Sequence, residues 1–497
     1  MSARAELGTL EASGLIQIAT LQPELEYLFR HALVQEAAYA TLLKQDRRAL
    51  HLAAAETILA LHPERERELA GVVAMHLELG GDAARATQYL VLAGEHALER
   101  FASKESASFF ARAYSLAGES QVDLRLKAAI GAAKAGWTYG KPGPDIERLD
   151  GALMNARESA DQRLVAEAYF WVAFLRRQRG EVPESSPALQ EALDRAAEVG
   201  EALHDPGASA LPRALMGSNS AFTGNLREGA REMQEALDQI ETKGDALSVA
   251  MVADFLALAY ARLGDFAAAE KTLARSWEFA GVGDEIARVD VQIAASGIAL
   301  ERGEPEKAFE QARDCASRAE DLGAYACVVA SNVMYGAAGL ALEDAPAAKA
   351  PLERGNELCQ VTNMAPFQTM IQALLGSVRA QLGDMPGGIA GWDEALARSR
   401  SMHDRYGEAQ TLWRRGQALG RQDRPDLDAA LADLDRAVEL FEAMEARPSL
   451  ARAARDRAEV LRGLGRAEEA DAVDRRALDL GRELGLKDFP FTGQDPA

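Results

Sequence analysis

The chain has 497 residues, of which 48% are apolar and only 6% aromatic, and its formal net charge is −22. Alanine, leucine, glutamate and arginine are abundant, which favours helices and argues against an extensive sheet. The negative net charge argues against nucleic acid or an anionic membrane as a partner, because both bind to basic protein surfaces. No segment approaches the ~20 consecutive apolar residues that a membrane-spanning helix needs.

The first 62 residues differ in pattern from the rest of the chain. Residues 15–18 and 25–28, separated by a Gln-Pro pair, predict a short β-hairpin. A helical stripe is expected to follow, formed by Phe29, Leu33, Ala37 and Ala40. The opening residues, MSARAELGTLEASGL, have no apolar signal-peptide core, so we expect a cytoplasmic protein.

Residues in and after this segment carry a resemblance to a known protein architecture. They are Tyr27, Phe29, Arg30, His31, Leu33, Glu36, Tyr39, Leu42, Arg47, Leu50 and His51, followed by Ala84, Arg85, Ala86, Tyr89, Ala93, Gly94, Glu95, Ala97 and Leu98. In order and spacing they resemble the junction of bacterial signalling proteins that combine a class III nucleotidyl cyclase or DNA-binding domain with a STAND-type ATPase, a winged-helix-like module and tetratricopeptide-like (TPR-like) repeats. The resemblance implies a winged-helix-like remnant in residues 1–62.

The ATPase and cyclase domains of such proteins would lie before Met1. The nearest stretch to a phosphate-binding loop, GWTYGKP at 136–142, is one residue short and has proline where the hydroxyl residue belongs. The chain is therefore expected to lack both domains. It is either the C-terminal region of a larger protein or a stand-alone relative, and both alternatives stay open.

Residues 63–160 are expected to form degenerate helical repeats, and residues 161–485 regular ones. In the regular part a small residue recurs about every 40 residues in the first of two amphipathic helices. The series is Ala173, Gly217, Ala257, Ser296, Gly336, Gly376, Gly416 and Ala458, and the second helix carries Ala192, Ala236, Ser276, Cys315, Gly355, Ala395, Ala437 and Ala477. Small side chains let two helices cross closely. The period predicts an all-α solenoid of helical hairpins.

The unit resembles the tetratricopeptide repeat. The residues that carry this resemblance are Leu256, Ala257, Tyr260, Ala269, Leu273 and Ser276. It implies a right-handed superhelical solenoid, although the units exceed the usual length of about 34 residues. No proline closes the second helix, and breakers come later, at Gly283, Gly323, Asn363 and His403, so we expect longer second helices. Residues 486–497 are predicted to be a flexible tail.

The sequence holds no recognisable catalytic or metal-binding pattern. His31 and His51 are expected to be structural, and Cys315, Cys327 and Cys359 to be reduced thiols. Neither HExxH nor GxSxG is present. We therefore expect a protein that is not an enzyme and uses no cofactor or metal.

In TPR arrays the first helix of each hairpin lines the concave face, and the resemblance implies a partner-binding groove there. The groove positions are Glu167, Phe170, Phe174, Arg177, Ser218, Phe222, Met251, Asp254, Leu258, Arg262, Asp290, Glu301, Met370, Ser377, Gln381, Gln410, Trp413, Gln417 and Arg421. Among them Phe170, Phe222 and Trp413 are the predicted aromatic anchors.

Two functions follow as hypotheses. The first is a non-enzymatic TPR-like scaffold that binds a protein or peptide, or forms homo-oligomers, in cytoplasmic signalling. The alternative is a sensor region that binds a small effector and regulates a STAND-type ATPase or a nucleotidyl cyclase. An open groove would favour peptide binding, whereas a closed superhelix with a deep pocket would favour the sensor. The partner's identity stays open.

Overall fold

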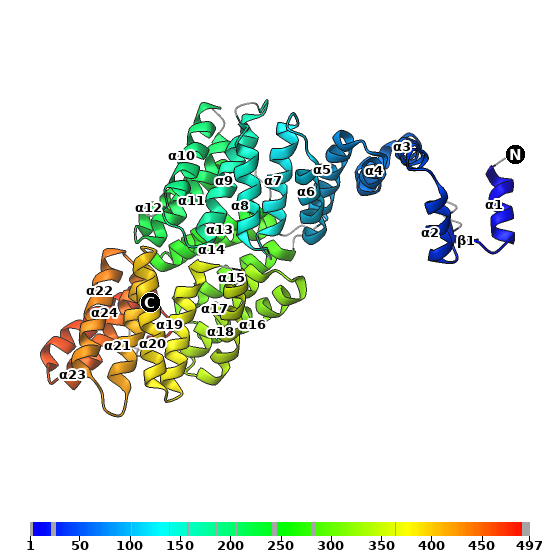
Figure 1. Ribbon diagram of the computed structural model, residues 1–497. Helices are drawn as coiled ribbons and strands as arrows, with labels where there is room; N and C mark the ends of the chain where they lie inside the picture. Colours follow the sequence, from blue (N-terminus) through cyan, green and yellow to red (C-terminus); the bar gives the residue numbers. More distant parts are fainter. Residues whose placement is uncertain are drawn as a thin grey trace.

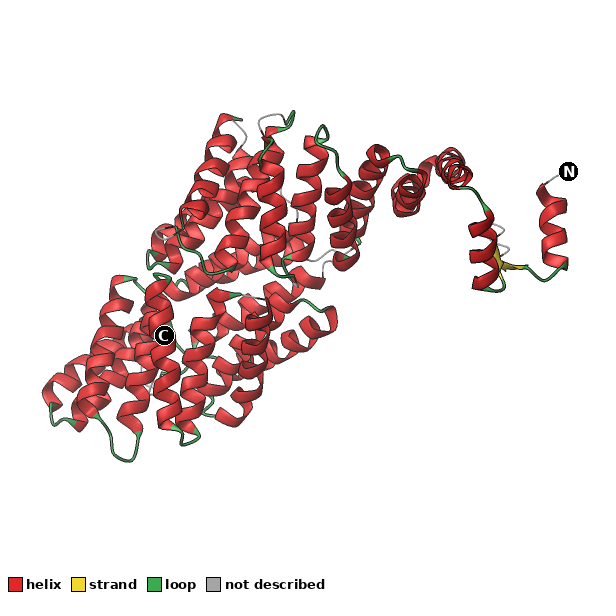
Figure 2. Ribbon diagram, viewed as in Figure 1, coloured by secondary structure: helices red, strands yellow, loops and turns green. Residues whose placement is uncertain are grey.

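The computed structural model describes residues 3–20, 26–100, 102–138, 140–156, 159–183, 186–203, 206–240, 246–280, 285–362 and 364–489. In these residues the chain forms 24 α-helices, a short 3₁₀ helix and one two-stranded antiparallel sheet (Figures 1 and 2). The predicted all-α solenoid of hairpins is confirmed. None of the described helices is both long and apolar enough to pass through a bilayer.

The N-terminal segment extends away from the solenoid (Figure 1). It contains α1 (Ala3–Ala12), β1 (Ile16–Thr20), β2 (Glu26–Phe29) and α2 (Ala32–Thr41). The predicted hairpin is confirmed, with Ile16 paired to Phe29. The predicted helical stripe is wrong at its start, because Phe29 belongs to a strand. It also stays uncovered, since no described side chain of α2 is buried and Leu33 is 79% exposed.

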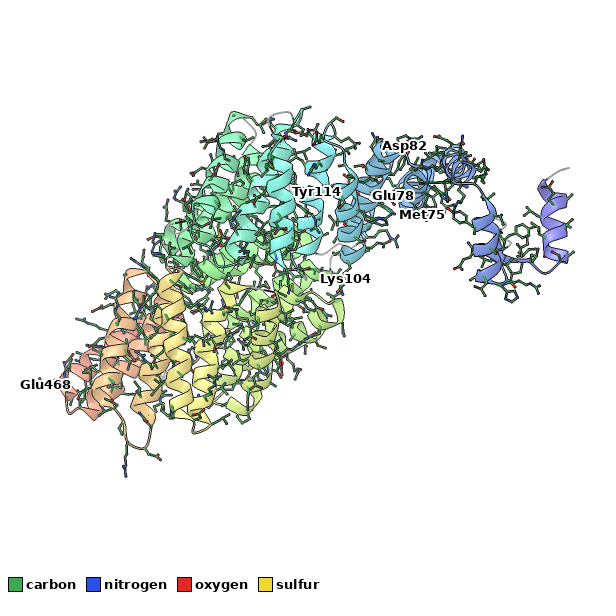
Figure 3. All side chains as sticks on the ribbon, in the orientation of Figure 1. Met75, Glu78, Asp82, Lys104, Tyr114 and Glu468 are labelled. Atoms are coloured by element: carbon green, nitrogen blue, oxygen red, sulfur yellow. The ribbon has the colours of Figure 1, made fainter. Side chains whose placement is uncertain are left out.

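The degenerate repeats form a continuous series of packed helices. They are α3 (Lys44–Leu61), the 3₁₀ helix η1 (Pro63–Arg65), α4 (Glu66–Gly80), α5 (Ala83–Glu99), α6 (Ser103–Leu116), α7 (Val122–Gly136) and α8 (Pro142–Leu153). Glu78, labelled in Figure 3, ties α4 to α6 through an ion pair with Arg112. His51 makes polar contacts through both ring nitrogens. Its Nε2 lies 2.9 Å from the Tyr39 hydroxyl, and its Nδ1 lies 2.9 Å from Nδ1 of His76.

The regular repeats follow as eight hairpins, an odd-numbered first helix and an even-numbered second helix in each. The first helices are α9 (Gln162–Gln178), α11 (Pro206–Phe222), α13 (Ala246–Leu263), α15 (Glu285–Arg302), α17 (Tyr325–Ala341), α19 (Ala365–Gln381), α21 (Arg405–Arg421) and α23 (Arg447–Gly463). The second helices are α10 (Pro187–Ala202), α12 (Leu226–Ile240), α14 (Phe266–Ala280), α16 (Pro305–Leu322), α18 (Ala345–Thr362), α20 (Met385–Ser401), α22 (Leu427–Ala443) and α24 (Ala467–Leu484).

The small residues lie where the two helices of a hairpin cross, as their spacing predicts. Ala173, Ala257 and Ser296 are fully buried. A Cβ atom at Gly376 would lie 3.0 Å from the carbonyl oxygen of Gly388 on the facing helix. The helices approach at backbone distance there, and a larger side chain would separate them.

The second helices are long, as predicted. Gly323 ends α16 in the left-handed conformation with φ 64°, and His403 follows α20 with φ 52°. The other two predicted breakers, Gly283 and Asn363, lie outside the described residues. Turn carboxylates begin the second helices, as where Asp384 accepts a hydrogen bond of 2.9 Å from the Gly387 amide.

The solenoid winds far enough to contact itself. Figure 1 shows α9–α14 as one tier and α17–α24 as another beneath it, and α9 contacts α19 while α13 and α15 contact α23. The contact points are the left-handed glycines of the hairpin turns, where the next tier approaches so closely that a Cβ at Gly180 would lie 2.5 Å from the Ala365 Cβ. Gly224, Gly264 and Gly303 meet the later tier in the same way. Lys104, labelled in Figure 3, lies similarly close to Gly323.

The end of the described chain is part of this closure. Leu486 and Phe489 are buried, and the Lys487 amide donates a hydrogen bond of 2.9 Å to the carbonyl oxygen of Arg302. The flexible tail predicted from residue 486 is therefore wrong for residues 486–489, because these apolar side chains cover the end of α15. Residues 490–497 lie outside the described residues.

Candidate ligand-binding channel

A cavity of about 620 Å³, partly open to solvent, lies among the first helices where the solenoid contacts itself. Its walls are the inner faces of α13, α15, α17, α19, α21 and α23, together with Asp488 after the last helix. Ligand sites of small molecules commonly have volumes of about 300–1,000 Å³. The cavity, called the channel below, therefore has the size of a ligand site.

The channel is richer in cations than the rest of the chain. Four arginines face three carboxylates along its wall, although the whole chain has a formal charge of −22. The seven residues are Arg262, Arg414, Arg421, Arg452, Glu301, Glu343 and Asp488. Arg452 pairs with Asp488 and Arg421 pairs with Asp456, so an anionic group inside would be attracted mainly by Arg414.

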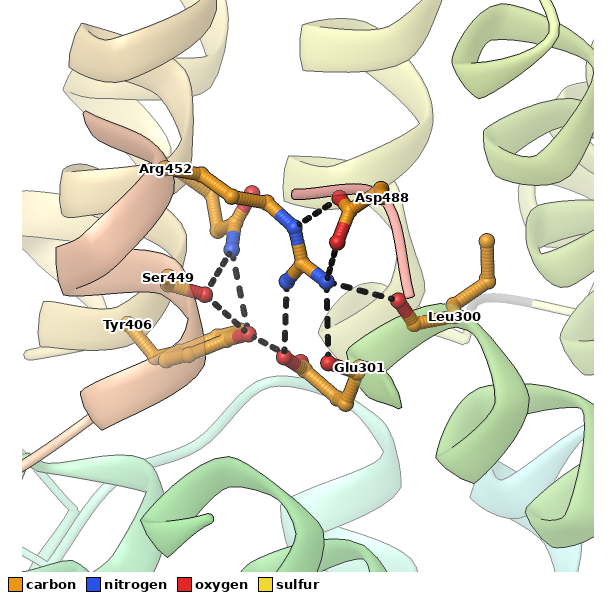
Figure 4. Close-up of polar contacts among 7 residues, drawn as sticks. Leu300, Glu301, Tyr406, Ser449, Arg452 and Asp488 are labelled. Carbon is orange, nitrogen blue, oxygen red and sulfur yellow. Dashed lines mark hydrogen bonds and ion pairs between the residues drawn. The ribbon is translucent and has the colours of Figure 1, made fainter. Parts of the chain in front are cut away.

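One wall is fixed by a polar network between the tiers (Figure 4). The Tyr406 hydroxyl donates a hydrogen bond of 2.7 Å to Glu301, and Gln410 Nε2 donates to the Tyr406 and Ser449 oxygens at 3.0 and 3.1 Å. Burial raises the pKa of Tyr406 well above its ordinary value, so the hydroxyl keeps its proton. Arg262 lies over the same ring at 4.1 Å from its centroid.

Arg452 connects three separate parts of the chain (Figure 4). Its Nε lies 2.6 Å from a carboxylate oxygen of Asp488, and its Nη2 donates to the carbonyl oxygen of Glu301 at 3.0 Å. The Leu300 carbonyl accepts a further bond of 3.5 Å. Because α23, α15 and the segment after α24 meet at this guanidinium, Arg452 holds the channel closed at that side.

Asp456 positions three of the predicted groove residues. Trp413 Nε1, Gln417 Nε2 and Arg421 Nη2 donate to its carboxylate at 2.6, 2.9 and 3.0 Å. Burial raises the pKa of Asp456, and Arg421 and the indole bond oppose that rise. These side chains are thus held in place by bonds on their outer sides.

Arg414 differs from the other arginines of the channel. Arg421 and Arg452 form ion pairs, whereas the described residues supply no ion pair or hydrogen bond to Arg414, whose Nε is buried without a partner. Among the described residues it has a ring contact with the neighbouring Trp413, whose centroid lies 5.8 Å from the guanidinium carbon. Burial lowers the pKa of Arg414 to about 10, despite the opposing charge of Glu301.

A second, smaller pocket of about 100 Å³ adjoins the channel, and Leu258 and Met334 line both. This side pocket lies among α9, α13, α15, α17 and α19 and is mostly apolar. Two carboxylates interrupt its lining, Asp254 and Asp290. Burial, followed by the charge of Asp290, raises the pKa of Asp254 well above its ordinary value.

The structure brings most of the predicted groove residues to these two cavities. The channel is lined by Leu258, Arg262, Glu301, Met370, Ser377, Gln381, Gln410, Trp413, Gln417 and Arg421, and the side pocket by Phe174, Met251, Asp254, Leu258 and Asp290. Whether they contact a partner stays a prediction.

Five of the predicted residues, Glu167, Phe170, Arg177, Ser218 and Phe222, line neither cavity. Phe170 was predicted as an anchor, yet it is buried and packs against Trp171 with ring centroids 5.5 Å apart. It fills the space between helices because α9 carries successive aromatic residues that cannot all face inward. The other aromatic anchor of this group, Phe222, is covered on one face by Arg177, at 4.5 Å.

Several polar residues of the site were not predicted from the sequence, among them Tyr406, Arg414, Arg452 and Asp456. A signal for Arg414 does exist, because Gln410, Arg414, Gln417 and Arg421 follow each other at steps of four, three and four. That spacing puts them on one face of α21.

Among the described residues no group of three or more His, Cys, Asp or Glu side chains is arranged to hold a metal ion. The three cysteines are buried and unpaired with one another. The expectation that the protein is not an enzyme stays a prediction.

No protein-family model and no curated protein matches the sequence. The fold is similar to that of a Rap protein solved in complex with Competence and Sporulation Factor, with a TM-score of 0.56 and 14% sequence identity, over 74% of this chain and 99% of that chain. The Rap conjugation gene regulator of the plasmid pLS20 in complex with the Phr* peptide gives a TM-score of 0.47 at 11% sequence identity, over 73% of this chain and 96% of that chain. A STAND protein with a tetratricopeptide repeat sensor from Pyrococcus horikoshii gives a TM-score of 0.46 at 16% identity, over 81% of this chain and 59% of that chain. At these identities the likeness concerns the fold alone. The chain is a TPR-like, all-helical repeat protein.

Proposed function

We propose that the protein is an effector sensor whose channel binds a short peptide through a carboxylate of the peptide. The observation that carries this proposal is Arg414, a cation without an ion-pair partner among the described residues at the wall of a cavity. A buried charge is costly unless it is paired. A ligand carboxylate would supply the missing partner, and a charge-assisted, bidentate contact suits a guanidinium.

The closure of the solenoid supports a small ligand rather than a folded partner. Because the tiers meet at the turn glycines and at Arg452, the inner faces of the first helices border a space of about 620 Å³ that is partly open to solvent. Such a space suits a few amino-acid residues. Of the two hypotheses drawn from the sequence, the closure thus favours the small effector.

Amide side chains support a peptide among small effectors. Gln381, Gln410 and Gln417 line the channel from two first helices. Gln410 and Gln417 use their amide nitrogens in bonds with neighbours, which leaves their carbonyl oxygens for the N–H groups of a ligand. A peptide backbone offers such N–H groups at regular intervals. The Rap protein with the similar fold was solved in complex with Competence and Sporulation Factor, which agrees with a ligand-binding function for this fold.

The proposal is tested by thermal shift and calorimetry of the whole chain with pools of tripeptides to pentapeptides that carry a free C-terminal carboxylate. We expect some members to stabilise the wild type, and the same peptides with an amidated C-terminus to bind at least tenfold more weakly. Arg414→Met should lose this discrimination. Arg436→Met, at an exposed outer position, should keep it. If no peptide of any pool binds, or if amidation has no effect, the proposal is wrong.

The remaining assignments stay proposals. Residues 1–62 are proposed as the junction segment, 63–160 as degenerate repeats and 161–485 as the regular array. Relationship to STAND-type signalling proteins is likewise proposed. Nothing in the described residues supports an association with a cyclase. Self-association would compete with the effector hypothesis, and light scattering with and without peptide separates the two.

A further inference from the structure

The side pocket is built differently from an ordinary gap in a helical core. An aromatic pair forms part of its wall, since the rings of Trp137 and Phe174 meet edge to face with centroids 5.5 Å apart. Its volume of about 100 Å³ is several times the ~15 Å³ that one ordered water needs. The pocket therefore has room for the end of a ligand group.

Acceptor atoms without donors converge on this pocket. Asp254 is only 5% exposed, and neither of its carboxylate oxygens has a hydrogen-bond partner. The hydroxyl of Ser276 acts on the Asp254 carboxyl as a donor and opposes the rise of its pKa, although it also lies 3.4 Å from the carbonyl oxygen of Ala250. Gln178, from α9, adds a side-chain oxygen that is also buried without a partner. A buried acceptor without a well-placed donor costs free energy, so a ligand that brings N–H donors to these oxygens would be stabilised here.

The residues around Asp254 favour an organic cation as the group that donates these hydrogen bonds. Asp290, also in the lining, is a second acidic side chain that raises the pKa of Asp254, and no cation is among the groups that act on Asp254. Mg²⁺ and Ca²⁺ need about six or more oxygen ligands, and this apolar lining offers too few. Aromatic rings attract cations, and Phe174 and Trp137 belong to the same wall.

We infer that the side pocket binds a positively charged nitrogen group, an ammonium or a guanidinium, through Asp254 and the aromatic wall. The inference deepens the proposed function, on which its peptide part rests. Because Leu258 and Met334 border both cavities, one ligand reaches from the channel into the side pocket. Such a ligand carries a carboxylate toward Arg414 and a cationic nitrogen toward Asp254. The nitrogen is either the N-terminal ammonium of a peptide or a lysine or arginine side chain.

The experiment first uses simple probes on the whole chain. Isothermal titration calorimetry compares n-butylamine and n-butylguanidine with n-butanol, which has the same apolar part and no charge. We expect millimolar binding of at least one cation and at least tenfold weaker binding of the alcohol. Asp254→Asn should remove the preference for the cation, whereas Asp479→Asn, at an exposed position on α24, should leave it unchanged.

A second variant covers the case in which Asp254→Asn fails to fold, as judged by circular dichroism. Trp137→Leu keeps both carboxylates and removes one aromatic face, so it should weaken binding of the amine severalfold and leave binding of the alcohol unchanged. Equal binding of amine and alcohol by the wild type would overturn the inference. So would unchanged amine binding by a folded Asp254→Asn variant.

Peptides then identify the source of the nitrogen and separate this inference from the proposed function. N-acetylation should weaken binding tenfold if the N-terminal ammonium enters the pocket, and replacement of lysine by norleucine should do so if the side chain enters. Binding of amines without binding of any peptide would refute the peptide function and leave the cation site standing. Peptide binding that is indifferent to both changes would refute the cation site and leave the peptide function standing.

Discussion

Replacing Arg414 by methionine should stabilise the free protein and abolish its response to a carboxylate ligand. Burial lowers the pKa of Arg414 to about 10, well below its ordinary value, which corresponds to about 3 kcal/mol lost by the charged form on folding. Part of the side chain is reached by solvent in the channel, so we expect a gain of about 1–3 kcal/mol. Methionine keeps the unbranched shape and has no charge.

The sign follows from proton binding. A cation whose pKa is lower in the folded state binds its proton more tightly when unfolded, so its charge costs stability at every pH below about 10. Wild-type stability should therefore recover only as the pH rises through that value, whereas the variant should show no such rise from this site.

Urea unfolding at pH 7.5, followed by far-ultraviolet circular dichroism, measures the change. Arg436→Met is the matched control, because the Arg436 side chain is 54% exposed and its pair with Glu439 spans one helical turn. We expect a change within about 0.5 kcal/mol for the control. A loss of more than about 1 kcal/mol in Arg414→Met would refute the reasoning, because the guanidinium would then be stabilising the fold rather than waiting for a ligand.

Three further predictions concern the solenoid itself. Burial raises the pKa of Asp404 to about 6, so the folded state holds the proton of this carboxyl more tightly than the unfolded state does. The stability that this proton contributes is present below pH 4 and is lost as the pH rises through about 6. In parallel urea titrations, Asp404→Asn should therefore be more stable than the wild type by about 1–3 kcal/mol at pH 8 and equally stable at pH 4. Gly229→Val should lower the free energy of unfolding by at least about 1–3 kcal/mol, because the valine side chain would clash with the carbonyl oxygen of Gly217. Gly143→Ala is the control: its Cβ would lie in open space, so the change should be neutral or stabilising. Equal urea midpoints for the two variants would contradict the close crossing of the helices. Glu343 occupies a hairpin-turn position at φ 58°, so Glu343→Gly should raise stability by about 1 kcal/mol in the same assay, and a decrease would mean that its carboxylate contributes more than the backbone strain costs.

The local architecture was predictable because it depends on neighbours in the sequence. The small residues of the two helices lie within one unit of about 40 residues, and their burial at the crossings follows directly from that spacing. The long second helices were likewise predictable from the positions of Gly323 and His403. At the N-terminus the same reasoning identified the hairpin and misplaced the helix start, since an apolar stripe does not indicate whether anything covers it.

The closure was not predictable, because it joins residues far apart in the chain. Arg452 contacts the carbonyl oxygen of Glu301, and the glycine at 180 meets Ala365, at separations that no local pattern encodes. Small errors in the angle between successive hairpins add up over several units, so the pattern of one unit does not determine whether the solenoid meets itself.

The same limit applied to the charges of the site. Arg414 and Arg415 are adjacent and chemically identical in the sequence. In the fold, Arg415 Nε lies 2.7 Å from Asp433 and its Nη1 2.8 Å from Asp393, whereas Arg414 faces the channel without an ion pair. Only the relative rotation of α21 and its neighbours distinguishes the paired arginine from the unpaired one.

The closure and the channel are energetically connected through Glu301. Its carboxylate accepts the hydrogen bond of Tyr406 in the contact between the tiers, and it is also the charge that partly offsets Arg414. A ligand carboxylate beside Arg414 would repel Glu301 while relieving the guanidinium, so binding would shift the balance of the inter-tier network. A site whose charges are left unpaired in the free state gains more from its ligand than a neutral site would. A ligand carboxylate at Arg414 would therefore couple occupancy of the channel to the contact between the tiers, as the proposed effector sensor requires.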